Sequence, residues 1–326
     1  MTEHEQPLSS VLETVGETPL VAIDVGPPSV DVYAKLETFN PGASVKDRIG
    51  RYMLRAMLDR GEIDPGGTVI EPTAGNTGIG LAIAAQQLGL NAIFVVPERF
   101  SKEKQQLMQA LGARVENTPT EDEMSGAVDR AHELADEIDN SVVPQQFANP
   151  LNTEAHYATT GPEIYGALAD EVGAIVVGCG TAGTLMGIAK YAREQNGDTH
   201  ICAVEPEGSV YGSLLDGSPE HEEYKIEGIG TSDPTTNELF DPTLVDTIEQ
   251  VSDRDAHTEL KRLAREEGHL VGSSAGAASH AARAVANRID RDELSVPHQT
   301  VVTVFPDTSE RYLSKGIYNS FEEWSG

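Results

Sequence analysis

Residues 40–48 spell Asn40-Pro41-Gly42-Ala43-Ser44-Val45-Lys46-Asp47-Arg48, a turn followed by the start of a helix. Asn-Pro-Gly is typical of a turn. Ser44 followed three residues later by Asp47 is similar to a capping box, which marks a helix N-terminus. Beyond it, apolar residues continue at helical spacing, and Gly61 stands where a C-terminal cap is expected.

Lys46 then occupies the second helical position. The positive end of a helix disfavours an ammonium there and favours a neutral amine. A lysine that forms a Schiff base must be neutral to react. The stretch by itself leaves two readings open: a catalytic lysine or an exposed first-turn lysine.

Length and composition limit the class of protein. The 326 residues suffice for one large or two ordinary domains. No apolar run is long enough to span a bilayer, and the N-terminus lacks the basic and apolar regions of a signal peptide. Cys179 and Cys202 provide neither a disulfide framework nor metal-ligand spacing, so no metal is expected. We expect a soluble, cytoplasmic protein.

The charge is strongly acidic, with 53 Asp and Glu against 23 Lys and Arg and a formal net charge of -30. Such a field repels nucleic acids and anionic membranes, so neither is an expected partner. Arginine outnumbers lysine among the basic residues. Because salt screens the repulsion, this composition suits a salt-rich cytoplasm, and we hypothesise a halophilic origin.

Strands and helices alternate along the chain, which is typical of parallel sheets covered on both faces. Predicted strands are Thr18–Ile23, Val30–Glu37, Thr68–Glu71, Asn91–Val96, Ala113–Glu116, Val142–Gln145, Ala174–Val177, His200–Glu205 and Thr300–Phe305. Besides the Lys46 helix, predicted helices are Gly78–Leu88, Lys102–Leu111, Gly126–Ile138, Thr153–Leu168, a helix ending at Glu194, Asp253–Glu267 and one opening at Val271–Gly276. Residues 207–243 are predicted to be irregular.

The fold predicted is α/β with two domains, each a mostly parallel twisted sheet with helices on both faces. Residues 39–149, with residues 1–16, are assigned to a smaller N-terminal domain that carries the substrate loop. Residues 150–326, with residues 17–38, are assigned to a larger domain that binds the cofactor phosphate.

Thr73-Ala74-Gly75-Asn76-Thr77-Gly78 stands between a predicted strand and a predicted helix. Backbone amides and two hydroxyls at a helix N-terminus form a site suited to a carboxylate. The alternative is an ordinary capped turn, which usually needs a single capping residue. The anion site is therefore favoured.

Gly178 to Gly183 spell G-x-G-x-x-G after a strand, with Glu205 at the end of the next strand. This pattern also fits a nucleotide-dependent dehydrogenase, in which the acid would bind a ribose. Against that alternative, the motif lies mid-chain, and Thr181 and Thr184 can donate hydroxyls to a single phosphate. It also leaves Lys46 and the Thr73 loop without a role.

Other polar residues give weaker signals. Spacing alone favours Ser273 or Ser274 as a plain helix N-cap. His156, His257 and His269 have no partner spacing and are interpreted as surface or core residues. Nothing marks Cys179 as a nucleophile.

Taken in order, the motifs resemble those of the fold-type II pyridoxal-phosphate enzymes, in the family of cysteine synthase (O-acetylserine sulfhydrylase) and the cystathionine β-synthase catalytic core. The resemblance runs from Glu17-Thr-Pro-Leu to Glu310-Arg-Tyr-Leu-Ser, nearly the whole chain. It includes the residue 40–50 stretch, Glu71-Pro-Thr-Ala-Gly-Asn-Thr-Gly-Ile-Gly, Gln145-Gln-Phe, Thr159-Thr-Gly-Pro-Glu-Ile and Glu227-Gly-Ile-Gly.

The resemblance implies pyridoxal 5'-phosphate in the cleft between the two domains, and a role for each matching position. Lys46 would hold the cofactor as a Schiff base and act as the catalytic base. Asn76 would bond the ring hydroxyl, and Ser274 would meet the ring nitrogen. The phosphate would be held by Gly180, Thr181, Ala182, Gly183 and Thr184. The substrate carboxylate would be received by Thr73, Ala74, Gly75, Thr77 and Gln146.

Two positions depart from the family pattern. The family usually has serine at the position of Ala74, so the serine hydroxyl is missing here. It usually has glycine at the position of Ala182. Neither change removes the chemistry, but substrate preference could shift.

The activity implied is β-replacement through an α-aminoacrylate, forming L-cysteine from O-acetyl-L-serine and sulfide in a homodimer. Cystathionine β-synthase-type condensation of serine with homocysteine is the alternative within the family. A catalytically idle binding protein and a nucleotide-dependent dehydrogenase are alternatives from other classes. Retention of Lys46 together with the substrate loop argues against an idle protein.

Overall fold

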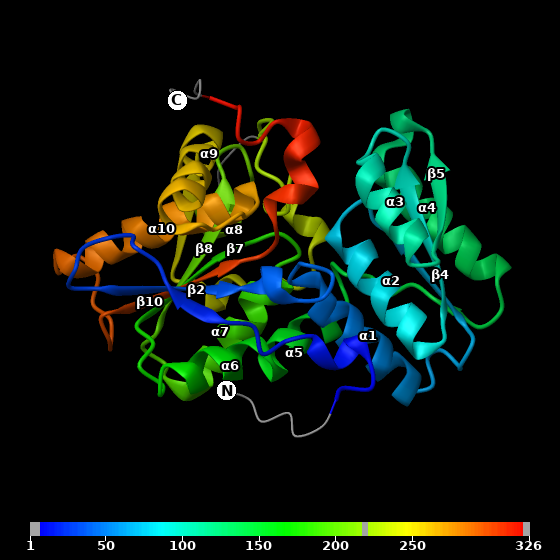
Figure 1. Ribbon diagram of the computed structural model, residues 1–326, viewed down its shortest axis with the longest axis horizontal. Coiled ribbons are helices and arrows are strands. Elements are labelled where there is room, and N and C mark those ends of the chain that lie inside the picture. Colours follow the sequence, from blue (N-terminus) through cyan, green and yellow to red (C-terminus); the bar gives the residue numbers. More distant parts are fainter. Residues whose placement is uncertain (1–6, 217–220, 322–326) are drawn as a thin grey trace. The chain divides into compact units, whose positions relative to one another are not determined.

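The computed structural model describes residues 7–216 and 221–321 (Figure 1). The chain divides into two compact units. Unit 1 contains the residues up to Gly16 together with Asn40–Ala155. Unit 2 contains Glu17–Phe39 and the residues from His156 onward. The functional roles assigned above to two domains stay a prediction.

Unit 1 is built on a four-stranded sheet with the order β5-β4-β3-β6, in which every neighbouring pair is parallel. Its strands are β3 (Thr68–Pro72), β4 (Asn91–Pro97), β5 (Arg114–Thr118) and β6 (Ser141–Val142). Its helices are α1 (Lys46–Asp59), α2 (Asn76–Leu88), α3 (Lys102–Ala110) and α4 (Glu123–Glu137), with short 3-10 turns at Val11–Thr14 and Thr120–Asp122.

Side chains of β4 point alternately to two separate cores. Phe94 and Val96 pack in a core with α1 and α2, whereas Ile93 and Val95 pack in a core with α4. A strand buried on both faces reads as a continuous apolar run, and Asn91–Pro97 has that composition. Helices therefore cover both faces of this sheet, as predicted.

Unit 2 is built on a six-stranded sheet with the order β1-β2-β10-β7-β8-β9, parallel except for the pairing of β1 with β2. The strands are β1 (Leu20–Ala22), β2 (Asp31–Leu36), β7 (Ala174–Gly178), β8 (His200–Pro206), β9 (Thr247–Val251) and β10 (Thr300–Phe305). The helices are α6 (Thr160–Ala167), α7 (Gly183–Gln195), α8 (Ser213–Asp216), α9 (Asp253–Arg262) and α10 (Ser273–Asp290). Helix α5 (Leu151–Ala158) contains one of the three points at which the chain passes from one unit to the other.

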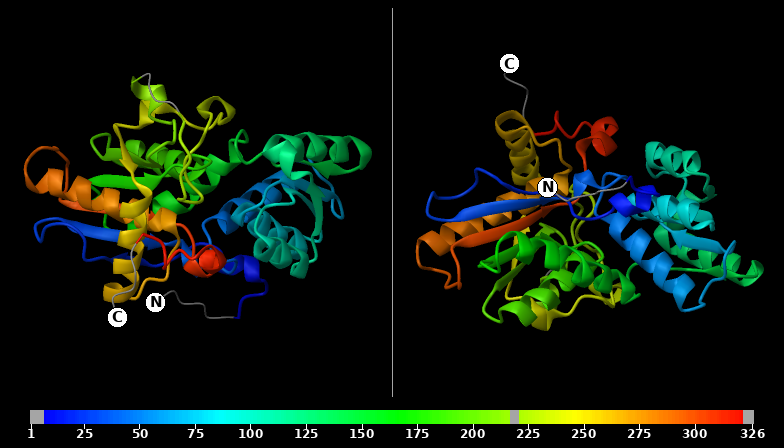
Figure 2. Two further views of the ribbon diagram at one scale, coloured as in Figure 1. Left: turned by 90° about the horizontal axis from the view of Figure 1, so that it is seen from above. Right: turned by 60° about the horizontal axis from the view of Figure 1, so that its bottom comes forward.

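The same alternation covers both faces of the second sheet. Val176 and Val204 lie in a core with α9 and α10, and Val177 and Ala203 lie in a core with α6 and α7. Figure 2 shows the orange helix α10 and the green helices α6 and α7 around these strands. The predicted α/β architecture with mostly parallel sheets is confirmed.

Helices α1 and α2 of unit 1 cross in direct backbone contact. A Cβ added to Gly50 would lie 2.4 Å from the carbonyl oxygen of Gly80, and a Cβ added to Gly80 would lie 2.5 Å from the carbonyl oxygen of Lys46. Only glycine fits at such a crossing, because any side chain would push the helices apart. The two glycines therefore fix the helix that begins with Lys46 against the helix that follows the Thr73 turn.

Several predicted boundaries are corrected by the structure. Helix α2 begins at Asn76, two residues earlier than predicted, and β6 is shorter than the predicted strand Val142–Gln145. The predicted helix Thr153–Leu168 is divided into α5 and α6. Pro162, near the start of α6, explains the division, since proline lacks the amide hydrogen that would continue the first helix.

Two further features were not predicted. The edge strand β9 was missed, because its sequence Thr-Ile-Glu-Gln-Val is largely polar and mostly half-exposed. The predicted helix Asp253–Glu267 ends as α9 at Arg262 and continues as a π-helix over Leu263–Glu267. Short 3-10 turns occur at Glu37–Phe39, Pro234–Thr236, Pro242–Leu244 and Ser309–Lys315.

The helix crossing predicts the effect of a single methyl group. Gly80→Ala should lower the free energy of unfolding by about 3 kcal/mol, because the new Cβ overlaps backbone that cannot move aside. Gly166→Ala in α6 is the matched control, since nothing lies within 4 Å of its added Cβ. Chemical denaturation measures both variants. Equal stability of the two would contradict the proposed crossing.

Candidate active site

Lys46 is the first residue of α1, one position earlier in the helix than predicted. Its backbone N–H donates to Ser44 Oγ at 3.3 Å. The predicted capping box is wrong: the N-cap is Val45, and the carboxylate of Asp47 accepts from the backbone N–H of Gly42 instead. Lys46 nevertheless stands in the first turn, where the helix field disfavours a charged amine.

The turn between β3 and α2 presents backbone amides at a helix N-terminus. Gly75 is the N-cap of α2 and makes no side-chain capping hydrogen bond, and Asn76 is the first helical residue. Thr73 Oγ1 accepts from the N–H of Gly75 at 3.4 Å. In contrast, α3 is capped by the side chain of Ser101. The start of α2 thus keeps the character of an anion site.

Gln146 meets this turn from the loop after β6. The hydroxyl of Thr77 donates to Gln146 Oε1 at 2.6 Å, and both residues are buried. The structure therefore brings together the two predicted carboxylate-binding segments, the Thr73–Thr77 turn and Gln146. With Oε1 occupied, the Nε2 end of the Gln146 amide is its remaining donor group.

Glu71 binds the backbone of the loop that carries Gln146, and it was not predicted as a site residue. Its carboxylate accepts from the backbone N–H groups of Gln145 at 3.0 Å and Gln146 at 3.2 Å. Burial raises the pKa of Glu71 from 4.5 to about 7, and the two amide hydrogen bonds oppose that rise. The signal was present in the quoted motif, which begins with Glu71 at the end of a buried strand.

In unit 2, the predicted phosphate loop leads into α7. Gly183 and Thr184 are the first two helical residues, and the preceding N-cap makes no side-chain capping hydrogen bond. A Cβ on Gly180 would lie 2.3 Å from the carbonyl oxygen of Gly228, so glycine is required there. Thr181, the next residue in the chain after Gly180, is buried.

Ala182 is the N-cap of α7 and adopts a left-handed conformation with φ of 61°. Glycine takes this conformation without a steric penalty, whereas a residue with a Cβ pays roughly 1–2 kcal/mol. The departure from the family pattern noted at this position is therefore a substitution at a strained point of the loop.

A hydrogen-bond network holds Gly180 of the predicted phosphate loop in place. Tyr211 Oη donates to the carbonyl oxygen of Gly180 at 2.5 Å, and Asn237 Nδ2 donates to Tyr211 Oη at 2.5 Å. The carboxylate of Glu205 accepts from the backbone N–H groups of Tyr211 at 2.9 Å and Gly212 at 3.1 Å. The ribose role considered for Glu205 is not supported, because its oxygens hold the protein's own backbone.

Ser274 is the second residue of α10 and is buried. The helix N-cap is Gly272, so the expectation that Ser273 or Ser274 is a plain N-cap is wrong. Ser273 Oγ instead accepts from the backbone N–H of Glu227 at 3.0 Å. The side chain of Ser274 thus lies in the first turn of a long buried helix, as Lys46 does in α1.

His156 is a buried residue whose connection the sequence analysis missed. Its Nε2 lies 3.1 Å from Thr184 Oγ1, and its Nδ1 lies 2.9 Å from Thr160 Oγ1. The usable signal was the four-residue spacing from His156 to Thr160. This histidine therefore holds the Thr184 hydroxyl of the predicted phosphate loop.

The remaining candidates lie outside this chemistry. Cys179 and Cys202 are buried and form no disulfide within the described residues, and burial raises the pKa of Cys202 to about 12. The described residues contain no group of His, Cys, Asp and Glu able to hold a metal ion. Within residues 7–216 and 221–321, no helix combines the length and apolar character that crossing a membrane demands.

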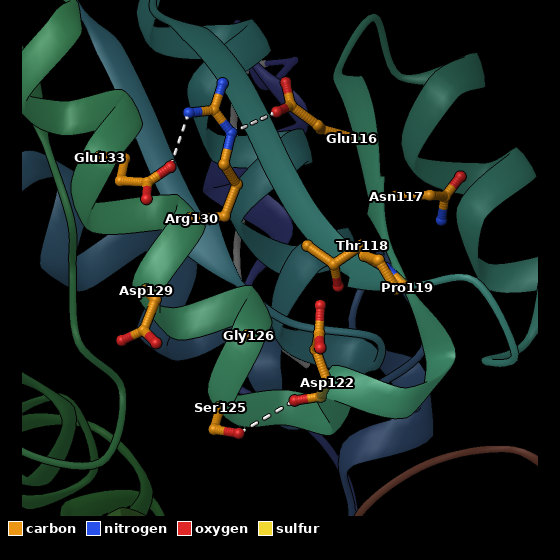
Figure 3. Close-up of a pocket in the computed structure, with 10 residues that line it drawn as sticks. All are labelled: Glu116, Asn117, Thr118, Pro119, Asp122, Ser125, Gly126, Asp129, Arg130 and Glu133. Carbon is orange, nitrogen blue, oxygen red and sulfur yellow. Dashed lines mark hydrogen bonds and ion pairs between the residues drawn. The ribbon is translucent and has the colours of Figure 1, made fainter.

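A hollow of about 560 Å³ lies on unit 1 between β5 and α4 (Figure 3). Arg130 Nε donates to Glu116 at 2.7 Å, and its NH1 group donates to Glu133 at 3.0 Å. Asp122 and Asp129 add further carboxylates to the lining. An acidic lining with its one arginine already paired repels a phosphate or carboxylate, and none of the predicted site residues lies in it.

The residues present fit the groups of pyridoxal phosphate. The start of α7 offers backbone amides at a helix N-terminus, which suit a phosphate. Lys46 offers an amine at a helix N-terminus, and Ser274 offers a buried neutral hydroxyl. The individual assignments stay predictions.

Comparisons with known proteins agree with this chemistry. A family model described as "Pyridoxal-phosphate dependent enzyme" matches residues 11–307. The "O-acetylserine dependent cystathionine beta-synthase" of Bacillus subtilis is 45% identical over 314 residues, covering 95% of this chain and 98% of the relative. A "Cysteine synthase" of Helicobacter pylori is 43% identical over 315 residues, covering 95% and 99%.

Solved structures share the fold. The crystal structure of the O-acetylserine dependent cystathionine beta-synthase from Helicobacter pylori has a TM-score of 0.84 at 43% identity, covering 96% of this chain and 99% of that one. Cysteine synthase from Entamoeba histolytica has a TM-score of 0.90 at 32% identity, covering 100% and 95%.

The buried carboxyl group of Glu71 predicts a pH-dependent term in stability. Between pH 4.5 and about 7 the folded state binds this proton more tightly than the unfolded state, so stability falls as the pH rises. Relative to Glu71→Gln, the wild type should lose roughly 3 kcal/mol across that window, the equivalent of its pKa displacement. Denaturation of both proteins at several pH values measures the difference. A difference that stays constant with pH would show that Glu71 does not titrate in this way.

Proposed function

Because the chain belongs to the family of pyridoxal-phosphate dependent enzymes, we propose that it catalyses β-replacement on O-acetyl-L-serine. Sulfide forms the new bond to Cβ, the acetyl group leaves as acetate, and L-cysteine is the product. The observation that carries the proposal is the α1–α2 crossing. It joins the helix that begins with Lys46 to the helix that follows the turn between β3 and α2. Relatives named cysteine synthase support the choice of reaction.

In this proposal the residues of unit 1 bind and deprotonate the amino acid. The amides at the start of α2 and Nε2 of Gln146 receive the α-carboxylate, with Thr73, Ala74, Gly75 and Thr77 shaping the turn. Lys46 Nζ would hold the cofactor and would also be the general base that takes the Cα proton. Asn76 bonds the ring hydroxyl.

The residues of unit 2 hold the cofactor's other end. Gly180, Thr181, Ala182, Gly183 and Thr184 bind the phosphate at the start of α7. When bound, pyridoxal phosphate withdraws electrons and so stabilises negative charge at Cα of the amino acid. Ser274 meets the ring nitrogen as a neutral partner, which favours departure of a good leaving group over chemistry that needs a stronger electron sink.

A substrate panel with the cofactor-loaded enzyme tests the proposal. O-acetylserine with sulfide should give cysteine, and Lys46→Ala should lower turnover by at least about 10⁴-fold because the variant loses both anchor and base. Circular dichroism controls for an intact fold. A protein that binds no pyridoxal phosphate, or that turns over equally well without Lys46, would contradict the proposal.

A second acceptor is a specific alternative. The Bacillus subtilis relative and the solved Helicobacter pylori structure reported above are named O-acetylserine dependent cystathionine beta-synthase. The same panel therefore includes homocysteine in place of sulfide, and serine or O-phosphoserine in place of O-acetylserine. Faster turnover with homocysteine would assign the chain to that activity while leaving the roles of Lys46 and Gln146 unchanged.

We further propose, from the composition, that the protein works in a salt-rich cytoplasm, and from the resemblance that it is a homodimer. Single arginines are shared among several carboxylates, as Arg130 is among Glu116, Glu133 and Glu137. With a net charge of -30, most carboxylates still repel one another.

Added KCl should therefore raise the free energy of unfolding by screening this repulsion. Urea denaturation from dilute buffer to molar KCl measures the effect, because urea adds no ions of its own. Full stability in dilute buffer, unchanged by KCl, would contradict the halophilic proposal. Light scattering in the same buffers reports the mass of the assembly, for which a monomer would contradict the dimer.

A further inference from the structure

Both carboxylate oxygens of Glu71 accept hydrogen bonds from one turn of the protein's own backbone. Oε2 accepts from the N–H of Gln145 and Oε1 from the N–H of Gln146, and only 1% of the residue is exposed. No ion pair to Glu71 occurs among the residues that the structure describes. Burial and these two amides are the causes that set its pKa, with no charged side chain contributing.

The turn that Glu71 holds is strained and leads directly to the substrate-binding glutamine. Gln145 adopts a left-handed conformation with φ of 59°, which is unfavourable for a residue with a side chain. The carbonyl oxygen of Gln146 accepts from Asn152 Nδ2 at 2.7 Å, and its Oε1 accepts from Thr77. Backbone N–H, backbone carbonyl and side-chain oxygen of Gln146 are thus all occupied.

Burying a carboxylate without a charged partner costs desolvation free energy, so a carboxylate is an unfavourable choice for holding a turn. A neutral amide has one accepting oxygen, whereas a carboxylate can accept from two adjacent N–H groups at once. The two hydrogen bonds from consecutive residues use this property of the anion. The arrangement orients the donor Nε2, which bonds no other residue within the described part of the chain.

We infer that Glu71 is a positioning residue, which fixes the Gln145–Gln146 turn so that Nε2 of Gln146 meets the α-carboxylate of the amino-acid substrate. The inference rests on the proposed function, because it takes that carboxylate as the ligand of Gln146. It assigns to Glu71 no contact with the substrate or with the cofactor. Its effect passes through the backbone alone.

Glu71→Gln tests the inference in the cofactor-loaded enzyme. One N–H of the turn then faces an amide NH₂ group, so the turn should loosen and O-acetylserine should bind at least about tenfold more weakly. Bound pyridoxal phosphate, measured by absorbance, should be unchanged. Amide hydrogen exchange at Gln145 and Gln146 should become faster. Unchanged affinity and unchanged exchange would overturn the inference.

Glu259→Gln is the matched control, since Glu259 is also buried but bonds Ser279, Arg262 and Arg283 between α9 and α10. It should lower stability without changing O-acetylserine affinity. Equal losses of affinity in both variants would show general destabilisation and overturn the inference. If Glu71→Gln does not fold, Glu71→Asp replaces it, because the shorter side chain keeps the charge but reaches the turn poorly.

The pH dependence of O-acetylserine affinity distinguishes a positioning role from a merely structural one, which would leave that dependence unchanged. As the pH falls from about 8 to about 6, wild-type Glu71 becomes protonated and the affinity gap to Glu71→Gln should narrow. A gap that is constant with pH would overturn the inference. Failure of the wild type to bind O-acetylserine would instead refute the proposed function, and is measured first.

Discussion

The close crossing of α1 and α2 at Gly50 and Gly80 is the constraint on which the proposed chemistry depends. Because each glycine lies against backbone of the other helix, the start of α1 cannot shift relative to α2. Lys46 begins the first helix and Asn76 begins the second. Two helix N-termini, one with the amine proposed to hold the cofactor and one with the amides proposed to receive the carboxylate, are thereby fixed to each other within unit 1.

Both units use the same device to hold a functional loop. Strands β3 and β8 each end in Glu-Pro, at Glu71-Pro72 and Glu205-Pro206. Each buried carboxylate accepts from two consecutive backbone amides, those of Gln145–Gln146 or those of Tyr211–Gly212. In unit 1 the loop leads to the proposed carboxylate site, and in unit 2 it leads through Tyr211 to Gly180 of the proposed phosphate loop.

The sequence predicted the family and the α/β architecture, because alternating apolar strands and glycine-rich turns are local signals. The family match and the shared fold confirm both. The sequence did not reveal Glu71, His156 or Tyr211, whose roles arise from contacts between distant segments. Short-range rules also misplaced the start of α1, whose N-cap is Val45, and missed the polar strand β9, where tertiary packing rather than propensity decides. Residue roles at the proposed site came from the resemblance, and they stay proposals.

The central claim is that Lys46, one of eight lysines, is the residue that carries the cofactor. Borohydride reduction of the pyridoxal-phosphate-loaded enzyme fixes the cofactor covalently to whichever lysine holds it, and peptide mass spectrometry then identifies that residue. The account predicts a single modified peptide containing Lys46. Modification of another lysine, or no modification of a loaded enzyme, would contradict it.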